Sequence, residues 1–84
     1  MEDEYINVTI RYKNQDLDLR FSKRLSLEQL EDLVKKSSLE NHLGILEKNW
    51  ILEISNKPII IERHRALADY PVGNGDVLEV KFNG

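Results

Sequence analysis

Apolar and polar residues alternate along the first part of the chain in the way that half-buried β-strands do. Apolar residues occupy every second position at Ile6, Val8 and Ile10, with polar residues between them. This period of two turns one face of a strand toward a core. Residues 13–16 are turn formers. The alternation then resumes, with apolar side chains at Leu17, Leu19 and Phe21. The pattern predicts an N-terminal β-hairpin.

A helix is predicted directly after the hairpin. Ser26 and Gln29 have the spacing of a capping box, in which each side chain bonds the backbone N–H of the other residue. Acidic residues come early in this segment and basic residues late, as the helix dipole favours. Glu31 and Lys35, like Asp32 and Lys36, also have the four-residue spacing that favours an ion pair on a helix. We expect about three helical turns. The apolar face should consist of Leu27, Leu30, Leu33 and Val34.

The second half of the chain contains three further strand patterns. Residues 37–48 fit either an extension of the helix or an irregular loop, because Gly44 interrupts their apolar residues. We expect a third strand over residues 50–55, a short fourth strand over 59–61 and a last strand over 77–82. The inward side chains of the third and last strands should be Trp50, Leu52, Ile54, Leu78, Val80 and Phe82.

The order of these elements restricts the fold. A hairpin, a helix, two strands and a last strand call for one sheet wrapped across one helix. The sequence therefore predicts an α+β fold of the β-grasp type, with a mixed sheet of four to five strands packed across one main helix. A chain of 84 residues supports a single core. We expect residues 1–84 to form one domain, with residues 1–4 as a disordered acidic N-terminus.

Composition and charge exclude several classes of function. Twelve basic and fifteen acidic residues give a net charge of -3, and no long basic stripe indicates a nucleic-acid binder. The chain has no cysteine, which rules out disulfides and thiolate chemistry and fits a cytoplasmic protein. Its N-terminus is acidic, and no apolar run approaches the roughly 18 residues that a membrane span needs. We expect a cytoplasmic protein that is not inserted in a membrane.

Residues that could support catalysis or bind a cofactor or metal are also missing. The two histidines, His42 and His64, fall on different elements, so they lack the clustered ligands of a metal site. The glycine-rich segment 73–76 leads into a strand, where a phosphate-binding loop would lead into a helix. A turn with positive φ angles explains these glycines better. We therefore expect no catalytic residues, no cofactor and no metal.

The segment 67–80 resembles the C-terminal third of ubiquitin, in which Leu-x-Asp-Tyr precedes a turn and the last strand. In this resemblance Asp69 and Tyr70 correspond to the pair that locks a short turn through the tyrosine hydroxyl. The resemblance implies a ubiquitin-like β-grasp over nearly the whole chain.

Four short motifs also resemble the YukD/EsaB family, the ubiquitin-like proteins of Gram-positive type VII secretion systems. They are Val8-Thr9-Ile10, Asp18-Leu19-Arg20, Trp50-Ile51 and Gly75-Asp76-Val77-Leu78. The resemblance implies a cytoplasmic accessory protein of WXG100 secretion that binds membrane-embedded machinery, such as ATPase or pseudokinase subunits. The alternatives are a generic ubiquitin-like interaction domain from another pathway, or a truncated modifier or sulfur carrier.

The chain departs from ubiquitin in the two features that serve ubiquitin's function. It ends without the Gly-Gly tail, so we expect no conjugation to targets. Charged residues also replace ubiquitin's apolar patch on the outer face of the sheet. As a candidate partner-binding face, the alternation places outward Arg11, Arg20, Ile51, Glu53, Val77, Glu79 and Lys81. Ile51 and Val77 are its expected apolar anchors, and a merely solvated sheet face is the other interpretation.

A second candidate site is the basic segment Arg63, His64 and Arg65. It could pair with acidic groups on a partner or with anionic lipid head groups, or it could be only a solvated loop. The exposed edges of a small sheet also make a homodimer possible.

Overall fold

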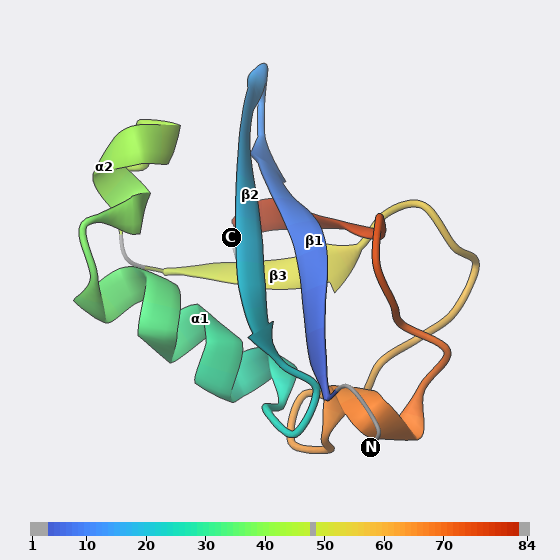
Figure 1. Cartoon of the computed structure of the whole chain (residues 1–84). Coiled ribbons are helices and arrows are strands. Elements are labelled where there is room, and N and C mark those ends of the chain that lie inside the picture. The colour runs from blue at the N-terminus through green and yellow to red at the C-terminus, as the bar shows by residue number, and fades with distance from the viewer. Residues whose placement is uncertain (1–3, 48, 83–84) are drawn as a thin grey trace.

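The computed structural model describes residues 4–47 and 49–82 (Figure 1). Its elements in chain order are β1 (Tyr5–Tyr12), β2 (Gln15–Ser22), α1 (Leu27–Lys36), α2 (Leu39–Leu43), β3 (Trp50–Ile54), a 3-10 turn η1 (Leu67–Asp69) and β4 (Val77–Phe82). The predicted disorder of residues 1–4 falls mainly on residues 1–3, outside the described residues. Glu4 itself forms an ion pair with Arg24 at 3.0 Å.

The four strands form one mixed sheet in the order β2-β1-β4-β3. β1 runs antiparallel to β2 and parallel to β4, and β3 runs antiparallel to β4. The two ends of the chain therefore supply the central strands, and α1 crosses one face of the sheet (Figure 1). This arrangement confirms the predicted α+β fold of the β-grasp type, a mixed sheet packed across one main helix.

The strand predicted over residues 59–61 does not form, and that prediction is wrong. Within the described chain, β3 is an edge strand whose strand partner is β4 alone. One cause lies on β3 itself. The N–H of Leu52 points away from β4 and donates to Oε2 of Glu31 at 2.8 Å. A side chain thus takes an edge donor that a fifth strand would need.

Helix α1 begins as the sequence predicts. Ser26 is the N-cap, and its side chain and that of Gln29 form both bonds of the capping box, at 3.2 and 3.0 Å. The buried face differs from the prediction at two positions. Glu31 is buried, whereas Leu33 is 45% exposed. At about 100° per residue, Leu33 lies well to one side of the face centred on Leu27, while Glu31 lies within it.

The region after α1 contains a second, short helix. α2 follows α1 after two residues and ends at Gly44, which has a φ of 76°. This left-handed conformation suits glycine and terminates the helix. The buried Leu43 and Ile45 tether the segment to the core, while Leu46 is 94% exposed. No helix in residues 4–47 or 49–82 is long and apolar enough to cross a membrane.

The core lies between α1 and the inner face of the sheet. Trp50 is 1% exposed, which confirms that it packs inward. Phe82 was also expected inward but is 41% exposed. It stands at the end of β4, where its ring contacts the edge of Tyr12 with the centroids 5.7 Å apart. The buried apolar residues are Ile6, Val8, Ile10, Phe21, Leu27, Leu30, Val34, Leu43, Ile45, Trp50, Leu52, Ile61, Leu67, Val72, Leu78 and Val80.

Two turns hold the chain ahead of β4. The hydroxyl of Tyr70 accepts a hydrogen bond from the N–H of Glu62 at 2.9 Å, which confirms the predicted tyrosine-locked turn. Gly75 has a φ of 88°, as the glycine-rich turn predicts, but Gly73 does not take a positive φ. The N–H of Asn7 donates to Oδ1 of Asn74 at 2.8 Å, so this turn is fixed to β1.

Candidate functional site

The register of the sheet brings most of the predicted partner-binding residues together on its outer face. Arg11 lies opposite Asp16 on one side and Glu79 on the other. Glu79 in turn lies opposite Glu53. Four charged side chains from four different strands thus form one row across the sheet. The row is defined here as the charge row, Asp16, Arg11, Glu79 and Glu53.

One end of the charge row is a well-formed ion pair. Nε and Nη2 of Arg11 donate to the two carboxylate oxygens of Asp16 at 2.9 and 3.2 Å. The hydrogen bond from Arg11 lowers the pKa of Asp16, and the same bond raises the pKa of Arg11. Both side chains are exposed, so solvent screens the pair and its net contribution to stability is small.

The other end of the charge row carries excess negative charge. Lys81 pairs with Glu79 through Nζ and Oε1 at 3.0 Å. Glu53 lies directly opposite Glu79 and has no ion-pair partner among the described residues. In the part of the chain that the structure describes, the Lys81 ammonium group pairs with Glu79 alone, and like charges in directly opposed positions, here Glu53 and Glu79, repel. A cation from a partner would relieve this repulsion.

Two apolar side chains border the charge row. Ile51 lies opposite Lys81, and Val77 lies opposite Thr9 of β1. Both are half-buried, so each keeps apolar surface that a partner could cover. The structure places these predicted anchors beside the excess negative charge.

Arg20 lies apart from the other predicted residues. It is on β2 opposite Asn7, four residues from Asp16, which is about 13 Å along a strand. Its guanidinium stands over the ring of Tyr5, 5.4 Å from the centroid. Arg20 therefore belongs to the far corner of the outer face.

The second candidate site is not a patch of unpaired cations. Nη1 and Nη2 of Arg63 donate to Glu31 at 2.6 and 2.5 Å, and Arg65 contacts Asp69 at 3.3 Å. Nδ1 of His64 lies 3.4 Å from Oε1 of Glu28. Each of the three basic side chains faces a carboxylate of its own chain, which reduces its attraction for an external anion.

Sequence reasoning missed the buried Glu31, whose side chain is only 3% exposed. Its carboxylate accepts hydrogen bonds from Arg63 and from the N–H of Leu52 on β3. The bond to Glu31 is the largest influence that raises the pKa of Arg63. A signal was present, because Glu31 falls between Leu30 and Val34 on the apolar face of the predicted helix.

Asp76 is a second missed carboxylate, and it positions the start of β4. Its Oδ2 accepts from the N–H of Gly73 at 2.8 Å and lies 2.9 Å from Nζ of Lys57. Its Oδ1 accepts from the amide of Asn56 at 3.0 Å. Burial acts to raise the pKa of Asp76, but these hydrogen bonds and the charge of Lys57 outweigh it and lower the pKa. These contacts of Asp76 with Gly73, Asn56 and Lys57 are called the clamp at the start of β4. They fix the turn that precedes Val77 and Glu79.

Comparisons with known proteins agree with the motifs and the fold. The family model described as WXG100 protein secretion system (Wss), protein YukD, matches residues 5–80. The chain is also 26% identical over 74 residues to an uncharacterized protein of Clostridium acetobutylicum, a match that covers 88% of this chain and 79% of that protein.

Solved structures confirm that the β-grasp is ubiquitin-like. A ubiquitin-like domain of an Arabidopsis thaliana protein matches with a TM-score of 0.70 and 14% identity, over 98% of this chain and 81% of that one. A designed protein based on ubiquitin matches with a TM-score of 0.68 and 18% identity, over 99% and 94%. A chain of the MycP5-free ESX-5 inner membrane complex matches with a TM-score of 0.74 and 18% identity. That match spans 95% of this chain but only 21% of the ESX-5 chain.

Proposed function

Because the chain belongs to the YukD family of the WXG100 protein secretion system, we propose that it is a non-catalytic accessory protein of that system that binds another protein through its outer sheet face. The observation that carries the proposal is the unpaired Glu53 opposite Glu79, beside the half-buried Ile51 and Val77. Apolar anchors beside uncompensated charge are suited to specific docking, because the charge selects the partner and the anchors supply affinity.

The chemistry of this face defines the partner surface. It should present a lysine or arginine to Glu53 and apolar side chains to Ile51 and Val77. A receptor for ubiquitin's apolar patch would instead have to desolvate the charge row, which is costly. We therefore propose that ubiquitin-type receptors do not bind this face.

The partner that we propose is membrane-embedded secretion machinery, such as an ATPase or pseudokinase subunit, reached from the cytoplasm. The ubiquitin-like part of a chain in the ESX-5 inner membrane complex supports this proposal at the level of fold. We also propose that the chain acts without being conjugated to targets. The intact mass of the protein isolated from its own cell tests this point, and a mass increased by a covalently attached protein would contradict it.

Affinity capture from the native cell tests the docking face. Glu53→Lys should lose the secretion component that the wild-type protein captures, because it places a cation where the partner's lysine or arginine would dock. Lys81→Glu instead adds negative charge beside Glu79 and should keep or strengthen capture. Arg20→Glu should weaken capture less, since Arg20 lies at the far corner. Asp32→Lys is the matched control, because it makes the same change as Glu53→Lys at an exposed position on α1. Undiminished capture by Glu53→Lys would refute docking through the sheet. Capture of proteins unrelated to secretion would favour a ubiquitin-like interaction domain of another pathway.

A further inference from the structure

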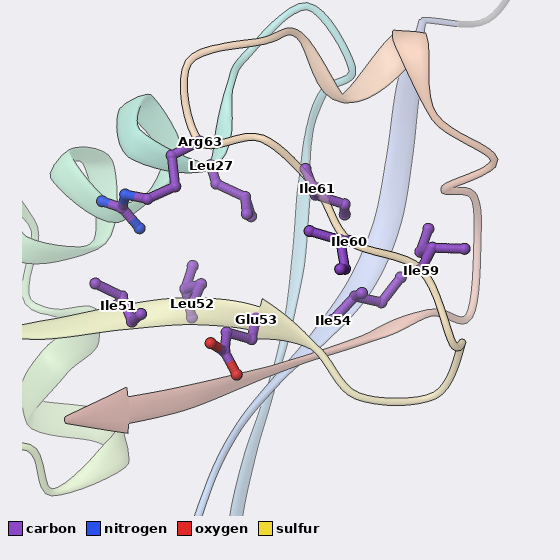
Figure 2. A pocket seen from close by; sticks show the side chains of 9 residues that line it. All are labelled: Leu27, Ile51, Leu52, Glu53, Ile54, Ile59, Ile60, Ile61 and Arg63. Carbon is purple, nitrogen blue, oxygen red and sulfur yellow. The ribbon is translucent and has the colours of Figure 1, made fainter. Parts of the chain in front are cut away.

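An apolar groove runs along the free edge of β3, separate from the centre of the outer sheet face. Figure 2 shows β3 on one side of the groove, the segment 59–61 on the other and the start of α1 at one end. Its volume is about 320 Å³, at the lower limit of the range typical of ligand sites. The lining residues are Leu27, Ile51, Leu52, Glu53, Ile54, Ile59, Ile60, Ile61 and Arg63.

Seven of the nine residues that line this groove are aliphatic, and the other two are Glu53 and Arg63. Leu27, Leu52 and Ile61 are buried beneath it, and Ile51, Ile54 and Ile59 are half-buried. Ile60, however, is 93% exposed. A large aliphatic side chain held in water beside other isoleucines offers surface whose burial would favour binding.

The backbone of β3 offers a hydrogen-bond donor toward the same side. The N–H of Ser55 donates to the carbonyl of Val77, the first residue of β4. Because N–H groups alternate in direction along a strand, those of Leu52 and Ile54 point away from β4. Leu52 donates to Glu31. Ile54 has no N–H partner among the residues that the structure describes. An extended segment laid along the edge could accept this hydrogen bond.

The charge at the rim of the groove selects the sequence of such a segment. Both nitrogens at the end of Arg63 are bonded to Glu31, so Arg63 offers little free positive charge. Glu53 is exposed and has no ion-pair partner in the described chain. The uncompensated charge at this rim is therefore negative. A second copy of the chain would fit poorly here, because a symmetric contact would bring its own Glu53 to the same interface.

We propose that this groove binds a short extended segment of another protein in which a large aliphatic residue lies next to a lysine or arginine. The aliphatic side chain would lie between Ile54 and Ile60 (Figure 2), and the cation would pair with Glu53. A backbone carbonyl of the segment would accept from the N–H of Ile54. The groove shares Ile51 and Glu53 with the proposed docking face, but the inference concerns the edge of the sheet and does not rest on a role in secretion.

Two short peptides test the groove directly on the isolated protein labelled with ¹⁵N. Both are acetylated and amidated, with the sequences Leu-Lys-Leu-Lys-Leu and Leu-Glu-Leu-Glu-Leu. The lysine peptide should shift the amide resonances of residues 51–54 and 59–61, including that of Ile54, in a saturable way. The glutamate peptide should leave them in place. Equal binding of both peptides, or shifts that map outside the groove, would overturn the proposal.

Matched variants make the test specific. Ile60→Asp should weaken binding of the lysine peptide by about tenfold, whereas Leu46→Asp should not, although Leu46 is 94% exposed and Ile60 is 93% exposed. Glu53→Lys should reverse the preference, so that the glutamate peptide now binds better. Equal losses for the two aspartate variants would contradict the groove, and so would a preference unchanged by Glu53→Lys.

Two outcomes separate this inference from alternatives. If the groove instead joins two copies of this chain, the same resonances will move as the protein is concentrated without peptide, and Ile60→Asp will abolish that change. Such a result would overturn the peptide proposal. Arg20→Glu lies outside the groove and should leave peptide binding intact. Loss of cellular capture in Glu53→Lys, together with failure of the peptide test, would leave the face proposal standing and reject the groove.

Discussion

Arg63 forms a two-pronged ion pair with Glu31, a carboxylate that is almost fully buried on α1. The same carboxylate accepts a hydrogen bond from the N–H of Leu52 on β3. One side chain thus joins the helix, the edge strand and the segment 59–63 that faces it. Buried charges are tolerated only when they are paired and hydrogen-bonded, and Glu31 meets both conditions. Leu52 and Arg63 also line the groove along β3.

Removing Arg63 alone should destabilise the fold more than replacing the whole ion pair. Arg63→Met leaves the Glu31 carboxylate buried and unpaired, and we expect the free energy of unfolding to fall by about 2 kcal/mol, below the usual cost because Arg63 is partly exposed. The double variant with Glu31→Leu should recover part of this loss. Urea denaturation of both variants measures the difference.

A surface pair provides the control for this prediction. Arg65→Met breaks the exposed contact with Asp69 and should change stability by less than about 0.5 kcal/mol. If Arg63→Met costs no more than Arg65→Met, the buried junction does not hold these elements together.

The tyrosine-locked turn gives a second prediction. Tyr70→Phe removes the hydroxyl that accepts from the N–H of Glu62 and should lower the free energy of unfolding by about 1 kcal/mol. Tyr12→Phe is the control, because the Tyr12 hydroxyl has no hydrogen-bond partner among the described residues. Indistinguishable melting curves for Tyr70→Phe and the wild-type protein would argue against the lock.

Local patterns predicted most of the fold because they depend on neighbours in sequence. The alternation around Val8 identified β1, and the spacing of Ser26 and Gln29 located the start of α1. The strand predicted over residues 59–61 does not form, because strand pairing depends on residues that are distant in sequence. Its isoleucines have a strand pattern, but pairing depends on a donor of Leu52 that Glu31 takes from a distant element. No local pattern contains that competition.

In the candidate site, too, features that depend on local sequence were predicted and features that depend on tertiary packing were not. Strand alternation correctly placed Glu53 and Glu79 on the outer face, because parity is local. That they lie directly opposite each other follows from the register of β3 against β4, which depends on tertiary packing. The groove beneath Ile60 was missed, because it arises between two segments whose separation the sequence does not encode locally.

The lowered pKa of Asp76 predicts a loss of stability in acid. The folded-state pKa lies below the ordinary value of 3.8, so folding favours the charged carboxylate. Its contribution is fully present above the unfolded-state pKa and is lost as the pH falls through the folded-state pKa. Urea midpoints measured between about pH 5 and pH 2 should therefore fall less steeply in Asp76→Asn than in the wild-type protein.

Asp16 serves as the comparison for this acid effect. The hydrogen bond from Arg11 also lowers the pKa of Asp16, but the pair is exposed and solvent screens it. Asp16→Asn should therefore reduce the fall of the urea midpoint in acid less than Asp76→Asn does. The reverse order would show that the clamp at the start of β4 is not the source of the acid sensitivity.

Glu53 offers the sharpest test of whether the outer face is shaped for binding. It lies opposite Glu79 without an ion-pair partner in the described chain, so Glu53→Lys replaces a repulsive cross-strand pair by an attractive one. We expect it to raise the free energy of unfolding by about 0.2–1 kcal/mol while it abolishes partner capture. The gain should shrink in 1 M salt, where the screening length is about 3 Å. Glu53→Gln should give a smaller gain, because it removes the repulsion without adding an attraction.

If Glu53→Lys is more stable than the wild-type protein but no longer captures the partner, the wild-type glutamate lowers stability and supports binding. This is the pattern expected of a residue that serves binding. If Glu53→Lys is destabilised, or if it is stabilised and still captures the partner, the unpaired carboxylate has no such role.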